Sequence, residues 1–254
     1  MIPGAVSVGF LHPGQVSAVF TKSLMEAMFV SAGRIVTHNR GYLAKHCGAG
    51  QLVESRNKVT AAFLEGDAEW LFFVDSDMGF APDTIERLIA AADPVDRPVV
   101  GALCFAHKNA GDGEFGAVRY VAQPTVYGYF EDDTTVGFFA DVDYERDALS
   151  PVSATGAACI LIHRNAAEIL RVRVGPEWWT PITHPKGPTT FSEDLSFCFK
   201  LAACDVPLYV HTGVKTTHDK GGVFLDESYF DTQQRCAGID GAPVVPRFDR
   251  KDAA

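Results

Sequence analysis

Two carboxylates, Asp75 and Asp77, flank Ser76 directly after the apolar run 69–74. A strand as apolar as this run is typical of a parallel sheet that is buried on both faces. Open α/β sheets bind their ligands at the carboxyl ends of such strands. Carboxylate oxygens at that edge suit Mg²⁺ or Mn²⁺, which bridge the phosphates of a nucleotide and take up the charge of a leaving diphosphate. We therefore expect Asp75 and Asp77 to form a metal and nucleotide site.

A second acidic pair, Glu193 and Asp194, follows Ser192 at the predicted start of a helix over residues 190–203. One interpretation is structural, because Ser192 can cap the helix and the two acids can complement its dipole. The other is catalytic, because a transferase needs a carboxylate that takes the proton of an acceptor hydroxyl. The sequence leaves both interpretations open.

Three weaker signals accompany these pairs. His218 follows a predicted strand, although a lone histidine is more often a surface or hydrogen-bonded residue than a ligand. Arg56, near the start of a predicted helix, is able to pair with phosphate, but exposed helix arginines are common. The pair Trp178 and Trp179 forms either an apolar platform for a sugar or part of the core.

Strand-like and helix-like patterns alternate through the first hundred residues, which predicts βαβ units and a mixed, mainly parallel sheet flanked by helices. The expected strands are 5–11, 34–37, 69–74 and 98–105, and the expected helices are 16–30, 51–64 and one that opens at 82–84. The polar, glycine-rich stretch 106–116 predicts a loop. Short β-type runs at 123–130, 137–142 and 152–162 predict an antiparallel extension, and a strand at 207–211 follows the second acidic pair. Residues 239–254 are expected to form a loose tail.

The composition narrows the classes of function. Lys plus Arg number 22 against 32 Asp plus Glu, so no global basic field draws polyanions to the protein. The first residues lack the features of a signal peptide, and the apolar stretch 154–162 is far shorter than the roughly 18 to 20 residues of a membrane span. Six cysteines without a C-x-x-C pair indicate a reducing cytoplasm and no zinc knuckle.

Taken together, these stretches resemble the GT-A-type glycosyltransferases, in particular family-two-like enzymes and the small ones of actinobacteria and their phages. The resemblance spans about residues 5–218 and rests on elements in the expected order. These are the turn 11–14, the Ser55-Arg56-Asn57 helix start, the strand 70–78, the strand with Gly156, the Glu193-Asp194 helix and the late His218. It implies a GT-A (Rossmann-like) fold over residues 1–238, with residues 1–105 as the nucleotide-binding half and 106–238 as the acceptor half.

The resemblance also implies roles for single residues. Asp77, with Asp75 close by, would hold Mn²⁺ or Mg²⁺ on the diphosphate of a nucleoside diphosphate sugar, and His218 would be the late metal ligand. Asp194 would be the base on the acceptor side, with Glu193 as the alternative. The donor-binding residues would be Pro13 and Gly14 against the nucleoside, Arg56 on the phosphates, and Ser76 between the two aspartates.

The sequence leaves the base of the donor, the acceptor and the class of protein open. The acidic residue with which such enzymes commonly read uracil is missing at 37–40, so the base of the donor nucleotide stays open between a UDP-sugar and a GDP-sugar. The expected acceptor is a hydroxyl of a phage virion protein, a modified DNA base or a glycan, with inversion favoured and a host cytoplasm as the location if the gene is phage-borne. Two alternatives are a non-catalytic nucleotide- or sugar-binding module and a sugar-phosphate nucleotidyltransferase, although residues 11–15 are not the G-x-G-T-R-type loop of the latter.

Overall fold

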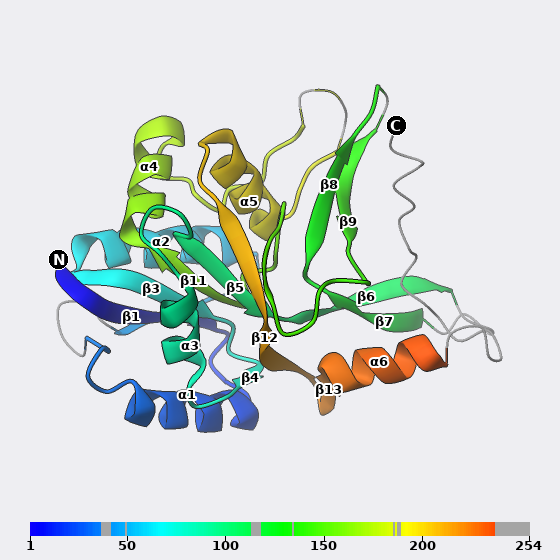
Figure 1. Cartoon of the computed structure of the whole chain (residues 1–254), viewed down its shortest axis with the longest axis horizontal. Helices are drawn as coiled ribbons and strands as arrows, with labels where there is room; N and C mark the ends of the chain where they lie inside the picture. The colour runs from blue at the N-terminus through cyan, green and yellow to red at the C-terminus, as the bar shows by residue number, and fades with distance from the viewer. Residues whose placement is uncertain are drawn as a thin grey trace.

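The structure is a computed structural model that describes residues 1–36, 42–48, 50–112, 118–133, 135–184, 186 and 189–236. Its central sheet has the strand order β10-β12-β5-β11-β3-β1-β2 (Figure 1). Strands β2, β1, β3, β5 and β12 run in one direction, whereas β11 and β10 run in the other. The predicted mixed, mainly parallel sheet is thereby confirmed. The strands on this path are β1 (Ile2–His12), β2 (Tyr42–His46), β3 (Ala68–Val74), β5 (Val99–Leu103), β10 (Leu149–Pro151), β11 (Cys159–His163) and β12 (Leu208–Lys220).

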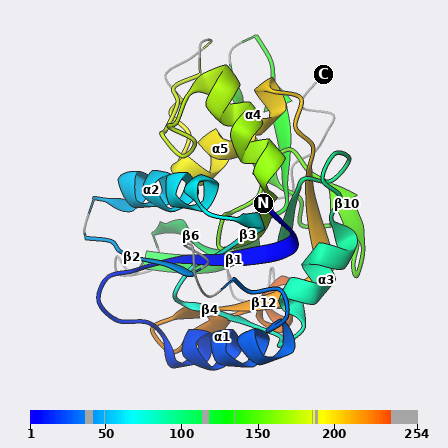
Figure 2. The same cartoon turned by 90° about the vertical axis from the view of Figure 1, so that its left-hand side faces the viewer.

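Helices cover both faces of the sheet (Figure 2). On one face lie α2 (Leu52–Glu65), α4 (Arg164–Val174) and α5 (Glu193–Ala203); on the other lie α1 (Ala18–Val30) and α3 (Thr84–Ala91). Strand β3 serves both cores because its side chains alternate: Leu71 and Phe73 pack on the first face, and Phe72 and Val74 on the second. This double burial explains why the sequence 69–74 is continuously apolar.

Two antiparallel hairpins lie beside the central sheet as separate two-stranded sheets. They are β6 (Phe105–Asp112) with β7 (Val118–Pro124), and β8 (Tyr127–Glu131) with β9 (Val136–Ala140). Helix α6 (Glu227–Arg235) packs on the first hairpin, where the rings of Phe230 and Phe105 lie 5.5 Å apart. In Figure 1 the hairpins extend to the right of the sheet.

Strand β12 links the central sheet to the residues of the site. Its first residues, Leu208 to His211, pair with β5, and the register shifts between His211 and Lys215. Beyond this irregularity β12 pairs with β4 (Met78–Phe80) and with β13 (Val223–Leu225). Because β4 begins right after Asp77, the second half of β12 runs alongside the Asp75-Ser76-Asp77 corner.

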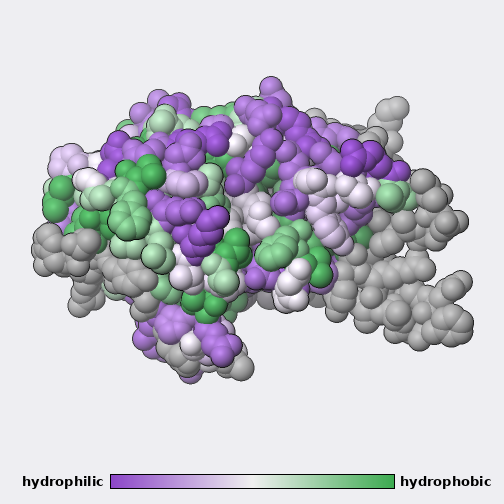
Figure 3. All heavy atoms as spheres, turned by 90° about the horizontal axis from the view of Figure 1, so that it is seen from below, coloured by the Kyte–Doolittle hydropathy of each residue, from purple (hydrophilic) through white to green (hydrophobic). Residues whose placement is uncertain are grey.

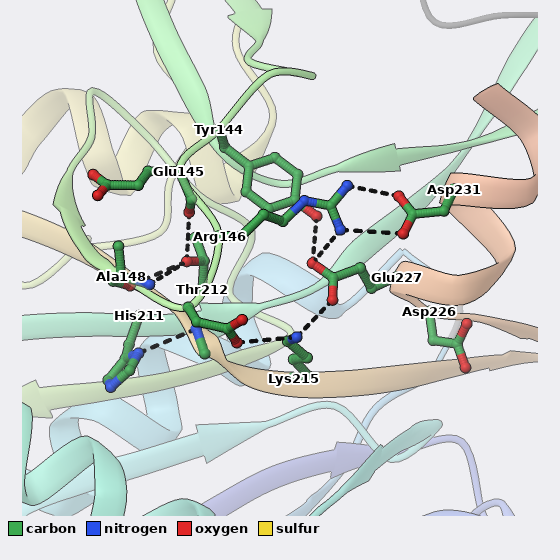
Figure 4. A network of polar contacts seen from close by, with 12 residues as sticks. Tyr144, Glu145, Arg146, Ala148, His211, Thr212, Lys215, Asp226, Glu227 and Asp231 are labelled. Atoms are coloured by element: carbon green, nitrogen blue, oxygen red, sulfur yellow. Dashed lines mark hydrogen bonds and ion pairs between the residues drawn. The ribbon is translucent and has the colours of Figure 1, made fainter. Parts of the chain in front are cut away.

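A network of polar contacts holds β12 at the irregularity (Figure 4). Lys215 bridges Asp147 at 3.0 Å and Glu227 at 2.7 Å. Glu227, on α6, also pairs with Arg146 and accepts a hydrogen bond from the Tyr144 hydroxyl at 3.0 Å. Burial and this hydrogen bond raise the pKa of Tyr144, so the phenol keeps its proton. The loop 143–148 and α6 are thus both fastened to the strand that carries His218.

Three sequence predictions differ from the structure. Residues 106–112 were expected to form a loop, but they form most of β6. A two-stranded ribbon depends on backbone pairing more than on apolar side chains, so the polar sequence of β6 did not predict a strand. The strand expected at 34–37 amounts to one bridge between Val6 and Ile35. The strand that pairs with β1 on this side is β2, a short edge strand. Of the run 152–162, only residues from Cys159 onward form a strand. Residues 37, 113–116 and 239–254 lie outside the described part of the chain.

In the part of the chain that the structure describes, no helix is both long and apolar enough to cross a bilayer. The lower face of the molecule, turned toward the viewer in Figure 3, shows small apolar patches interrupted by hydrophilic side chains.

Candidate functional site

A pocket of about 640 Å³ opens at the carboxyl ends of β1 and β3. Its lining includes seven of the predicted site residues: Pro13, Arg56, Asp75, Ser76, Asp77, Glu193 and Asp194. Gly14 is next to the lining, where its φ of 111° allows the tight turn that brings its amide to His12 Nδ1. The structure therefore gathers residues from positions 13 to 194 around one pocket. A second cavity, of about 420 Å³, is lined mainly by apolar side chains and contains none of these residues.

Asp77 and His218 meet at the edge of this pocket. The ladder between β4 and β12 sets Met78 opposite His218, and the Asp219 amide donates to the Asp77 carbonyl at 2.8 Å. His218 Nδ1 donates to the Phe105 carbonyl at 2.8 Å, which fixes the ring and directs Nε2 to Asp77 Oδ2 at 3.1 Å. A histidine held in this way through its other nitrogen is typical of metal ligands. Two residues that lie 141 positions apart thus form a pair, of which Asp77 lines the pocket and His218 lies behind the lining.

Lys220 completes this pair and was missed by the sequence analysis. Its Nζ lies 2.8 Å from Asp77 Oδ2, the same oxygen that His218 Nε2 faces. The available signal was spacing, because residues two apart on a strand point to the same side. Burial opposes ionisation of Asp77, but the hydrogen bonds from His218 and Lys220 outweigh it and lower the pKa of Asp77 to about 2. Asp77 is an anion over the whole physiological range.

Arg56 lies under the other carboxylates. Its side chain is 3% exposed, and Nη2 is 3.2 Å from Asp75 Oδ1 and 3.7 Å from Asp194 Oδ1. Nε lies 3.9 Å from Glu193 Oε1. The guanidinium carbon lies over the Phe73 ring, 5.1 Å from its centre, which is a cation–π contact. Three carboxylates already surround the guanidinium of Arg56. A contact between Arg56 and donor phosphates, which the resemblance implies, would have to compete with these three ion pairs.

The acidic pair at the start of α5 lies at a helix end and also lines the pocket. Glu193 and Asp194 occupy the first turn of the helix, and Ser192 precedes them without a side-chain capping bond. Burial, aided by the charge of Asp194, raises the pKa of Glu193. Asp194 Oδ1 has no hydrogen-bond partner among the described residues although it is buried. This oxygen lies on the side of Arg56, and Asp194 as a whole lines the pocket with Glu193.

The tryptophan pair belongs to the core. Trp178 and Trp179 are 1% and 0% exposed, and their indole nitrogens donate to the Ala167 carbonyl and to Thr60 Oγ1. Trp179 stacks on Phe197 with ring centres 4.1 Å apart. The interpretation of the pair as core is confirmed, and the platform interpretation is wrong. Trp179 instead forms part of the wall behind Arg56.

The comparisons with known proteins concern the fold. No protein-family model and no curated protein matches the chain. Among solved structures, the crystal structure of A197 from STIV matches with a TM-score of 0.51 and 15% identity over 89% of this chain and 91% of that one. A crystal structure of GalNAc-T7 with UDP, GalNAc and Mn²⁺ matches with a TM-score of 0.49 and 11% identity, over 86% of this chain and 44% of that one. The chain thus shares its mixed α/β fold with A197 from STIV.

Proposed function

We propose that the protein is a metal-dependent GT-A-type glycosyltransferase that moves a sugar from a nucleoside diphosphate sugar to a hydroxyl acceptor. The observation that carries the proposal is the convergence of two different acidic sites on one pocket. Asp77, which pairs with His218, lines this pocket together with Glu193 and Asp194. The first site suits the diphosphate of a donor, and the second suits the proton of an acceptor.

The donor atoms of Asp77 and His218 fit a small divalent cation. Oδ2 and Nε2 lie 3.1 Å apart, and neighbouring ligands of an octahedral ion at about 2.1 Å are about 3 Å apart. Within the described residues, no group of three His, Cys, Asp or Glu side chains is assembled for a metal. Mg²⁺ is commonly held by one or two side chains together with phosphates and water. We therefore assign Asp77 and His218 as ligands, and Asp75 as the partner of Arg56 beside them.

The charge of the pocket also favours a cation. Five acidic residues line it, namely Asp75, Asp77, Glu193, Asp194 and Asp219, whereas Arg56 is its basic lining residue among those described. Lys220 adds one more positive charge, on Asp77. A nucleoside diphosphate is itself an anion, so it would be repelled from this surface without additional positive charge. When bound, Mn²⁺ or Mg²⁺ would neutralise the diphosphate and so improve it as a leaving group.

In the mechanism that we propose, Asp194 is the general base and Glu193 is its alternative. The acceptor oxygen forms a bond to the anomeric carbon while the bond from that carbon to the diphosphate breaks. The hydroxyl proton passes to the carboxylate, and the bonding electrons leave with the diphosphate. Such proton removal contributes typically 10²- to 10⁴-fold to the rate. Attack from the side opposite the leaving group inverts the anomeric centre. Arg56 orients both carboxylates from below and neutralises part of their charge.

Several finer assignments are part of the proposal. Pro13 and Gly14 lie against the nucleoside of a UDP- or GDP-sugar, and Ser76 contacts the donor beside the metal. Residues 1–105 act as the nucleotide-binding half and 106–238 as the acceptor half. A virion protein, a modified DNA base or a glycan supplies the acceptor hydroxyl. The reaction takes place in a cytoplasm, in keeping with the free thiols of the cysteines in the described chain.

The test begins with calorimetry of UDP and GDP in Mn²⁺ and in EDTA, followed by detection of sugar release from the matching nucleotide sugars. Asp77→Ala should abolish Mn²⁺-dependent nucleotide binding. Asp194→Asn should retain binding and lose turnover by at least about 10²-fold. Asp205→Asn is the matched control, because its carboxylate is 90% exposed. An Asp194→Asn enzyme with full turnover would disprove the assignment of the base.

The same experiment separates the alternatives. A non-catalytic binding module would bind the nucleotide in Mn²⁺ and release no sugar to any acceptor or to water. A nucleotidyltransferase would consume a nucleoside triphosphate and a sugar phosphate and release pyrophosphate. The acidic pair on α5 favours transfer to a hydroxyl, because it adds a proton acceptor that a binding module does not need.

A further inference from the structure

The oxygen assigned to the metal already has a cationic partner. Lys220 Nζ lies 2.8 Å from Asp77 Oδ2, the oxygen that faces His218 Nε2 at 3.1 Å. A divalent ion that binds this oxygen would meet a positive charge at hydrogen-bond distance, which costs free energy in a partly buried site. Lys220 and the cation therefore compete for one oxygen.

Lys220 is free to change partner. It is the last residue of β12, its side chain is about one-third exposed, and Gly221 and Gly222 follow it with φ values of 67° and 93°. Both glycines line the pocket, so the end of β12 borders the space that the donor would fill. A lysine carries its charge on a flexible four-carbon stem with three rotatable donors, which suits it to move between two anions.

We propose that Lys220 is the counter-ion of Asp77 in the ligand-free protein and a ligand of the donor diphosphate in the loaded protein. The cation takes Oδ2 and displaces Nζ, which then donates to a phosphate oxygen held by the same cation. This inference rests on the proposed function. It gives the site one property that a simple two-ligand metal site lacks: metal binding without a diphosphate is opposed, and metal binding with a diphosphate is favoured.

Removal of the amine therefore has opposite effects on two affinities. In Lys220→Met, Mn²⁺ alone should bind about fivefold more tightly, because no ammonium has to leave Oδ2. In saturating Mn²⁺, UDP or GDP should bind about tenfold more weakly, because a charge-assisted hydrogen bond to phosphate is lost. A residue with a purely structural role would weaken both affinities or neither.

The experiment titrates the full chain with Mn²⁺ alone, followed by electron paramagnetic resonance of the free ion, and then with UDP and GDP in Mn²⁺ by calorimetry. Lys22→Met on α1 is the matched control, since it removes the same charge from a side chain that is 74% exposed. Lys220→Gln provides a second variant in case the methionine variant does not fold. The expected result is tighter Mn²⁺ and weaker nucleotide in both Lys220 variants, with no change in the control.

Two failures are distinguishable. If the wild type binds Mn²⁺ and nucleotide but the Lys220 variants do so with wild-type affinities, the exchange of partners is refuted and the proposed function is untouched. Weaker Mn²⁺ binding in the variants refutes the competition in the same way. If the wild type binds neither Mn²⁺ nor any nucleotide, the proposed function itself fails, and this inference fails with it.

Discussion

Replacement of Arg56 by methionine tests how the carboxylates of the site are held together. The guanidinium is 3% exposed and lies within 3.2–3.9 Å of Asp75, Asp194 and Glu193. Methionine keeps most of the contact with Phe73 but leaves three acids without their cation. Loss of one partner of a buried ion pair costs about 3–5 kcal/mol. Because these carboxylates are partly exposed and can take up protons, we expect the lower end, about 3 kcal/mol of unfolding free energy.

The sign of the pH dependence follows from the same geometry. Burial already raises the pKa of Asp75 and of Glu193 in the folded protein, and removal of Arg56 raises both pKa values further. Groups with raised folded pKa values stabilise the fold below their unfolded values, near 4, and this stabilisation is lost as the pH rises through the folded pKa. The difference between wild type and Arg56→Met should therefore be small near pH 4 and largest above neutrality.

Urea unfolding at several pH values measures this difference, and thermal unfolding should show a loss of about 6–12 °C near neutral pH. Arg56→Lys is the control that keeps the charge but not the planar fork, and it should lose less stability than the methionine variant. The reasoning is refuted if Arg56→Met unfolds within 1 kcal/mol of the wild type. If such a stable variant also loses UDP and GDP binding, Arg56 contacts the donor phosphates, as the sequence resemblance implies.

Three further variants probe other parts of the structure. Glu193→Gln should raise the melting temperature at neutral pH, because a carboxyl group whose pKa is raised in the folded protein destabilises the fold once it is ionised. This gain should vanish near pH 4. A gain that persists at pH 4 would show that ionisation of Glu193 is not its cause. Trp179→Phe should cost about 1–2 kcal/mol through loss of the 2.8 Å bond to Thr60, with nucleotide affinity unchanged in calorimetry. Glu227→Gln should cost about 1–3 kcal/mol in urea unfolding, because it weakens the contacts of Lys215 and Tyr144, and a neutral result would show that the network adds nothing to stability.

Patterns that depend on local chemistry could be predicted from the sequence. The unbroken apolar run of β3 predicts a buried strand, and the carboxylates that follow it predict the edge of the sheet. Helix α2 follows from its spacing of apolar residues, and α5 from its acidic first turn. These patterns put Asp75 and Asp77 at the end of a strand and Glu193 and Asp194 at the start of a helix, and the fold then brings all four to one pocket.

Features that depend on tertiary pairing could not be predicted in this way. Strand β2 is only five residues long and lies at the sheet edge, so its sequence carries no long apolar run that would predict its pairing with β1. Helix α4 buries only a narrow stripe of Ala166, Ala167 and Leu170 among arginines, and no prediction covers it. The position of Arg56 beneath three acids, and of Lys220 on Asp77, follows from contacts between segments far apart in the chain. Single-residue patterns cannot encode such contacts.

The change of partners along β12 limits how the chain can vary in length. Side chains alternate along a strand, so one residue added or removed between Thr216 and Lys220 would turn Asp219 toward Asp77 in place of His218 and Lys220. Two acids would then oppose each other where an acid and a base now pair. The irregular stretch between His211 and Lys215 is already out of register with β5, so it can absorb an insertion without that inversion. We therefore expect β12 to tolerate insertions and deletions before Lys215 but not after it, although the strand continues to Lys220.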